Sequence, residues 1–261
     1  MTSTAQAGTL EQALDDLERH ADDALRALTA AVKEAKRLKT AAANGQLRDV
    51  QQSVEAVDDL TASAARVAGD LRSSWRFDVT GYFESDGYTK ELLAATADAG
   101  VQAVESDQRI LAYPSIVQIS PSDATVVIDK KRERRVRPSV LARQLADLQG
   151  RPPKFKPEAF LGTLARAYDL VTPRPGATVK LAQVYSVLTL LPGASRDYTK
   201  PEFARDLYLL DQSGVTETKD KRSMSLPASA LTRGSGVLTT VTRAGQVKVY
   251  AGVSFTGPSS T

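Results

Sequence analysis

Six of the eight side chains from Lys130 to Arg137 are basic, and this is the pattern in the chain best suited to a direct chemical role. The six are Lys130, Lys131, Arg132, Arg134, Arg135 and Arg137, and the following segment adds Arg151, Lys154 and Lys156. Ammonium and guanidinium groups at this density neutralise phosphates and release counterions from a nucleic acid. Phosphate contacts position a protein without reading bases, so we expect DNA or RNA binding without sequence specificity. The alternative is that the tract pairs with acidic residues of 77–128 or with a partner protein.

The start of this tract also resembles the metal site of restriction-endonuclease-like nucleases. In that family an acidic residue on one strand and an Asp/Glu-x-Lys triplet on the next hold Mg²⁺ and the attacking water. Here Asp129-Lys130-Lys131 supplies the triplet, Asp107 or Asp123 supplies the first carboxylate, and residues 88–149 match the expected order of helix, three short strands and helix. Carboxylate oxygens suit Mg²⁺, so the resemblance implies a metal-dependent nuclease as one alternative.

The sequence lacks the residues and motifs of the other common catalytic sites. The chain of 261 residues has no Cys and one His, which excludes disulfides, thiolate nucleophiles and the common zinc sites. It has no Gly-rich phosphate loop, no GxSxG and no HExxH motif. We therefore expect a non-enzyme with no catalytic residue, no metal, no cofactor and no small-molecule substrate. No apolar run approaches the length of a membrane span and no signal peptide is visible, so we expect a cytoplasmic protein without membrane contact.

The net charge of +3 conceals a strong asymmetry along the chain. Residues 1–128 carry −8, whereas residues 129–261 carry +11. Such an asymmetry suggests that the second half contacts a polyanion.

Two helical seams precede the basic tract. Apolar or Ala residues recur at spacings of four and three along each, at Leu10, Leu14, Leu17, Ala21, Ala24, Leu28, Ala31, Ala35 and Leu38, and at Leu47, Val50, Val54, Val57, Thr61, Ala64, Ala68, Leu71 and Trp75. The Asn44-Gly45 break between them predicts an antiparallel coiled-coil hairpin over 1–76. Because Ala-rich seams bury little area, we expect residues 10–75 to pack against a partner protein, a second copy or the rest of the chain.

Short elements follow the hairpin. We expect a helix at 89–99, strands at 101–105, 115–119 and 125–129, and helices at 137–149 and 157–171. These elements form a small α/β segment over 77–175 that contains the basic tract.

The last part, 176–261, resembles the winged-helix arrangement. A helix at 179–191, a second helix that starts with the capping box Thr199-Lys200-Pro201-Glu202, and a β-hairpin over 237–255 follow one another in that order. The resemblance implies DNA contact by Lys200, Arg205 and Gln212 on the second helix and by Arg233, Arg243 and Lys248 on the wing. Docking of a protein by the same module remains an alternative.

The whole chain is thus predicted to be mostly α with small β elements, an α+β protein with an N-terminal helical hairpin and a winged-helix-like end. We expect a non-enzymatic nucleic-acid-associated adaptor that contacts phosphates through the basic tract and recruits or dimerises through the hairpin. Two alternatives stay open: an interaction subunit of a larger assembly without nucleic-acid contact, and the Mg²⁺-dependent nuclease.

Overall fold

The computed structural model describes residues 8–227 and 236–257, and the chain divides into two compact units, 1–91 and 92–261. The fold is α+β as predicted: long helices accompany small antiparallel sheets. None of the described helices is long and apolar enough to cross a membrane. The three-part division at 76 and 175 stays a prediction.

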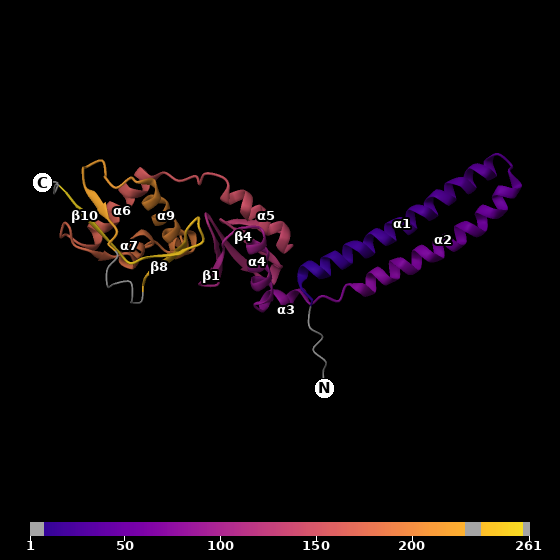
Figure 1. Cartoon of the computed structure of the whole chain (residues 1–261), viewed down its shortest axis with the longest axis horizontal. Helices are drawn as coiled ribbons and strands as arrows, with labels where there is room; N and C mark the ends of the chain where they lie inside the picture. The colour runs from indigo at the N-terminus through magenta and orange to yellow at the C-terminus, as the bar shows by residue number, and fades with distance from the viewer. Residues whose placement is uncertain (1–7, 228–235, 258–261) are drawn as a thin grey trace, which may run out of the picture. The chain divides into compact units, whose positions relative to one another are not determined.

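The first unit contains the predicted helical hairpin, in which α1 (Leu10–Ala43) and α2 (Leu47–Ser74) run side by side (Figure 1). A capping box of Thr9 and Gln12 starts α1 by satisfying amides that lack helical partners. Gly45 turns the chain with a φ of 69°, a conformation that costs glycine little.

The seam between α1 and α2 differs in part from the predicted one. Only Leu10, Ala24, Ala41, Ser53 and Ala64 are buried along the two helices. Leu28, Leu47 and Val54, which were predicted to lie in the seam, are between 49% and 75% exposed. The helices instead meet through small residues, which allow a close approach, and the buried Ser53 hydroxyl donates to Glu34 Oε1 across the seam at 2.7 Å.

Two further helices, α3 (Val79–Glu84) and α4 (Gly87–Asp98), follow the hairpin, and α3 was not predicted. Glu91 on α4 accepts hydrogen bonds from the backbone amides of Leu10 and Glu11 at 2.8 and 2.9 Å. A carboxylate at this position satisfies the exposed amides at the start of α1 and complements the helix dipole.

The second unit begins with a five-stranded antiparallel sheet in the order β1-β2-β3-β4-β5. The strands are β1 (Val104–Ser106), β2 (Arg109–Ala112), β3 (Ser115–Ser120), β4 (Thr125–Ile128) and β5 (Lys131–Glu133). The predicted strands at 115–119 and 125–129 are confirmed, while β2 and β5 were not predicted. The basic tract therefore starts in a β-hairpin, with Lys131 and Arg132 on its last strand.

Helices α5 (Pro138–Gln149) and α6 (Pro157–Val171) have the predicted bounds to within a residue. Each starts with proline, which lacks the amide hydrogen that a first helical turn leaves unpaired. A segment of seven residues, 150–156, joins them and carries Arg151, Lys154 and Lys156.

The C-terminal elements surround one hydrophobic core. The remaining helices are α7 (Leu181–Leu188), α8 (Ala194–Asp197) and α9 (Lys200–Ser213), and the remaining strands are β6 (Val179–Lys180), β7 (Ser223–Ser225), β8 (Leu238–Val241), β9 (Val247–Tyr250) and β10 (Gly252–Thr256). Strands β8 and β9 form a hairpin at the predicted turn, but it ends at Tyr250 and not at 255 as predicted. Strand β10 instead pairs with β6 and β7 in a three-stranded sheet of order β6-β10-β7. The core is built mainly from α6, α7 and α9, with Phe203, Leu207 and Leu210 of α9 fully buried.

Candidate nucleic-acid interface

The turn between β4 and β5 directs the two lysines of the basic tract to different places. Asp129 and Lys130 form this two-residue turn with φ values of 45° and 70°. Positive φ at both residues is the geometry of a type I′ hairpin turn. Lys130 lines one hollow of the second unit and Lys131 lines another, with Asp129 on the wall of both.

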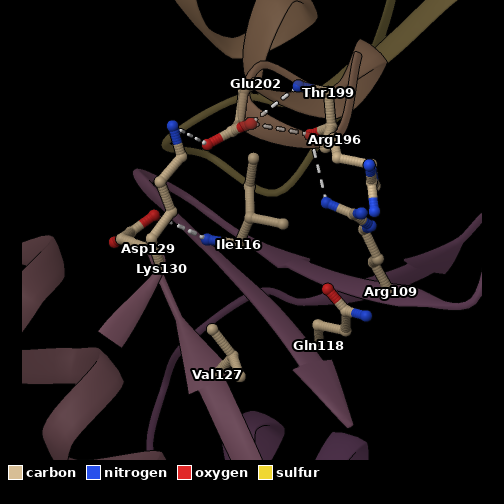
Figure 2. Close-up of a pocket in the computed structure, with 9 residues that line it drawn as sticks. All are labelled: Arg109, Ile116, Gln118, Val127, Asp129, Lys130, Arg196, Thr199 and Glu202. Atoms are coloured by element: carbon tan, nitrogen blue, oxygen red, sulfur yellow. Dashed lines mark hydrogen bonds and ion pairs between the residues drawn. The ribbon is translucent and has the colours of Figure 1, made fainter. Parts of the chain in front are cut away.

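The first hollow is small, about 70 Å³, and several of its polar lining residues bond to one another (Figure 2). Its lining residues are Arg109, Ile116, Gln118, Val127, Asp129, Lys130, Arg196, Thr199 and Glu202. Lys130 Nζ lies 3.2 Å from Glu202 Oε1 and donates a hydrogen bond of 2.6 Å to the Asp197 carbonyl. Lys130 therefore ties the β4–β5 hairpin to the start of α9.

Glu202 is a buried carboxylate held in its ionised form. It closes the capping box of α9 by accepting hydrogen bonds from the Thr199 amide at 2.7 Å and the Thr199 hydroxyl at 2.9 Å. Burial alone raises the pKa of Glu202, but the bonds from Thr199 and Lys130 outweigh it, so the pKa lies below its ordinary value. The cation of Lys130 thus has a structural partner.

The second hollow, of about 430 Å³, gathers predicted basic residues from three separate segments. Its lining residues are Pro114, Ser115, Asp129, Lys131, Leu148, Arg151, Pro152, Pro153, Lys154, Phe155, Arg205, Asp206 and Leu209. Lys131 comes from β5, Arg151 and Lys154 from the 150–156 segment, and Arg205 from α9. Four cations and two carboxylates therefore surround this hollow.

Arg205 is held in place by both carboxylates of this hollow. Its Nη1 lies 3.0 Å from Asp129 Oδ1 and its Nε lies 3.2 Å from Asp206 Oδ1. The Tyr198 hydroxyl also donates to Asp206, at 2.9 Å, yet burial dominates and raises the pKa of Asp206. Arg205 is only 22% exposed, so it forms part of the wall.

Lys131, Arg151 and Lys154 differ from Arg205 in being exposed and unpaired. Their side chains make no hydrogen bond or ion pair with any residue that the structure describes. The hydroxyl of Ser115, a residue on the wall of the same hollow, is buried and has no hydrogen-bond partner among the described residues. This hollow therefore presents three exposed cations, and charged donors of this kind form the stronger hydrogen bonds to anionic oxygen groups.

The other predicted binding residues fall into two groups. Three are in ion pairs: Arg132 with Asp123, Arg135 with Glu133 at 2.7 Å, and Lys248 with Asp211. The hydrogen bonds from Arg135 lower the pKa of Glu133 to about 2. Arg137 also has contacts of its own. Exposed side chains without a polar partner among the described residues are Arg134, Lys156, Lys200 and Arg243, and Arg233 lies outside the described residues.

Sequence reasoning missed two cations of the first hollow, Arg109 and Arg196. Arg109 Nη1 donates to the Thr199 hydroxyl at 3.1 Å. Arg109 is the one basic residue between Glu91 and Ile128, and it directly precedes an apolar run. This isolated position could have identified Arg109 as a candidate site residue. Arg196 lies in the short helix α8, which no sequence pattern predicted.

The carboxylates proposed for a nuclease site lie apart. Asp129 accepts from the Ile116 amide and pairs with Arg205, while Asp107 and Asp123 lie at the opposite end of the sheet. Four residues of β4 separate Asp129 from the 3₁₀ turn of Asp123, about 15 to 20 Å along an extended strand. Within 8–227 and 236–257, no group of three or more His, Asp or Glu side chains is placed to hold a metal ion.

Comparison of the chain with protein-family models, with curated proteins and with solved structures finds no match.

Proposed function

We propose that this chain is a non-enzymatic nucleic-acid-associated adaptor that holds a phosphate backbone at the hollow between β5, the 150–156 segment and α9. Lys131, Arg151 and Lys154 neutralise the phosphates, and the N-terminal hairpin recruits a partner or a second copy. One observation carries the proposal: three cations from two segments surround one hollow and have no polar partner among the described residues.

The physical basis is counterion release. Each phosphate neutralised on a duplex adds about 0.9 to the slope of log affinity against log salt. Arg205 contributes less because Asp129 and Asp206 already compensate its charge. The contacts carry no base-specific information, so binding is expected to be general in sequence.

The winged-helix resemblance is part of the proposal, with a changed role for its second helix. The element order α6, β6, α7, α9, β7, β10, into which the short α8 and the β8–β9 hairpin are inserted, and the strand order β6-β10-β7 support that architecture. However, seven of the fourteen residues of α9 are buried, among them Phe203 and Leu209. We therefore assign α9 to holding Arg205 in the hollow and leave only the exposed Lys200 and Arg243 as further phosphate contacts.

A second candidate function is that of an interaction subunit without nucleic-acid contact. The observation in its favour is that Lys130, Arg132, Arg135, Arg205 and Lys248 are all paired with acidic groups of the same chain. Because each of these ion pairs neutralises a basic side chain, fewer cations are available to bind phosphate. Under this alternative, Lys131, Arg151 and Lys154 would meet an acidic surface of another protein and chiefly affect association rate.

One experiment separates the two functions. Binding of fluorescent random duplex DNA and of single-stranded RNA is measured at low salt for the wild type and for a Lys131→Ala, Arg151→Ala, Lys154→Ala variant. A control variant removes three exposed arginines of α2, Arg48, Arg66 and Arg72, and so changes the net charge equally. We expect the first variant to lose most of the affinity and the control to retain it. Equal loss in both variants, or absence of wild-type binding, would refute the phosphate site.

A further inference from the structure

The helical hairpin presents an apolar surface that its own two helices do not cover. On α1, Leu25, Leu28 and Val32 are 63%, 49% and 53% exposed. Their spacing of three and four residues places them on one side of the helix. On α2, Leu47 and Val54 are 75% and 52% exposed.

These residues of α1 and α2 lie on the same flank of the hairpin. The observed seam residues Ala24, Ala31 and Leu38 define the heptad a positions of α1, which puts Leu28 at e and Leu25 and Val32 at b. On α2 the same register, set by Val57 and Ala64, puts Leu47 and Val54 at e. The ion pair of Arg37 with Asp49 joins the g positions on the other flank, so the e positions share the apolar one.

The hairpin gains little stability from its own seam. Of its five buried residues only Leu10 has a large side chain, and the other four are Ala24, Ala41, Ser53 and Ala64. At about 25 cal/mol per Å² of apolar area, burial in this seam contributes little folding free energy for the 62 residues of the two helices. Covering the exposed flank adds the larger side chains Leu25, Leu28, Val32, Leu47 and Val54 to the buried set.

The charges along α1 indicate what covers this flank. On this flank the charged side chains are those at the b positions, with Glu11 and Glu18 in the first half of α1 and Lys39 in the second, so the flank is acidic at one end and basic at the other. A parallel arrangement of two copies would place like charges together, whereas an antiparallel arrangement places each acidic half against a basic half. The second copy of α1 is therefore a complementary partner, in both charge and apolar pattern, when it runs antiparallel.

We propose that two copies of this chain associate through these flanks as an antiparallel four-helix assembly with its two-fold axis at Leu28. In this register Leu28 meets Leu28 of the second copy, Ala21 meets Ala35, and Leu14 meets Ala42, all at heptad e positions. The interface is isologous and closed, as expected for a two-fold dimer. The inference rests on the proposed self-associating role of the hairpin, and it stands independently of phosphate binding.

The first test measures mass by sedimentation equilibrium for the full chain over a wide concentration range. Leu28→Glu places two carboxylates together on the two-fold axis and removes two leucines from the interface, so we expect the dimer to weaken about a hundredfold or more. Thr29→Glu is the matched control, because Thr29 is exposed at the outward f position and adds the same charge. A monomeric wild type, or equal weakening by both changes, would overturn the proposal.

The second test determines the relative orientation of the two α1 helices by disulfide cross-linking. The chain has no native cysteine, so only the introduced cysteines can cross-link. Under mild oxidation, we expect Leu28→Cys to cross-link with itself and a mixture of Ala21→Cys and Ala35→Cys chains to form the mixed dimer. Ala21→Cys alone should not cross-link, because an antiparallel two-fold at Leu28 separates the two positions by about 21 Å along the helices, beyond the roughly 7 Å that a disulfide spans. Efficient cross-linking of Ala21→Cys alone would contradict the antiparallel register. Far-ultraviolet circular dichroism confirms that each variant keeps its helices, and duplex binding, measured in parallel, reports on the phosphate site separately.

Discussion

Lys130 and Lys131 are neighbours in sequence, yet the structure predicts opposite consequences for their replacement. Lys130 Nζ lies 3.2 Å from Glu202, whose side chain is 8% exposed, whereas the Lys130 side chain is 61% exposed. Loss of a partner costs about 3 to 5 kcal/mol in a fully buried pair and about 0 to 1 kcal/mol in an exposed one. Since Glu202 keeps its two bonds from Thr199, we expect Lys130→Ala to destabilise the protein by about 1 to 2 kcal/mol.

For a unit of this size that loss lowers the melting temperature by about 2 to 8 °C. Lys131→Ala removes an exposed side chain without a polar partner among the described residues, so its stability should stay within about 0.5 kcal/mol of wild type. Duplex binding should show the reverse order, with Lys131→Ala weakened and Lys130→Ala nearly unchanged. Thermal unfolding and anisotropy on the same samples test both halves. The reasoning fails if Lys130→Ala is as stable as wild type and binds as weakly as Lys131→Ala.

Three further predictions concern the same region. Thr199→Ala removes half of the capping box of α9 and should cost about 1 kcal/mol in chemical denaturation, whereas an unchanged midpoint would show that the cap is dispensable. Because the folded pKa of Glu202 lies below its ordinary value of 4.5, its contribution to stability is present above that pH and is lost as the pH falls through the folded pKa. Acid unfolding of Glu202→Gln should therefore depend less steeply on pH than that of wild type, and identical profiles would argue against this assignment. Ser115→Ala removes a buried hydroxyl without a partner, so the melting temperature should stay the same or rise, and a loss of more than about 1 kcal/mol would reveal a missed bond.

The longer helices were predictable because their signals are local, whereas the short helices α3 and α8 were missed. The capping box at Thr199 and Glu202, the prolines at 138 and 157 and the Asn44-Gly45 break each act over a few residues. Strand β5 escaped prediction because its three residues, Lys131–Glu133, are all charged, so no apolar period marks it. Strand β2 was missed although Ile110 and Leu111 are apolar and buried. The hairpin seam was partly wrong because Ala at many positions makes two neighbouring stripes look equally apolar, and only packing chooses between them.

The sequence shows which basic residues are candidates for the site, but not which of them form ion pairs within the chain. The density of cations at 130–156 drew attention to Lys131, Arg151 and Lys154, and the structure places these three side chains around one hollow. The acids that engage Lys130 and Lys248 are 72 and 37 positions away in the chain, so only the folded structure shows that these two lysines are occupied. Arg205 reaches the hollow from α9 for a similar reason, since Asp129 lies 76 residues before it.

The salt dependence of duplex binding tests the central claim most directly. Affinity of the wild type and of the Lys131→Ala, Arg151→Ala, Lys154→Ala variant is measured across a salt series with the same random duplex. If these three side chains contact phosphates, the slopes of log affinity against log salt differ by about 2.7, and a fourfold rise in salt costs the wild type about 40-fold more affinity than the variant. Parallel slopes for the two proteins would contradict the phosphate-binding account.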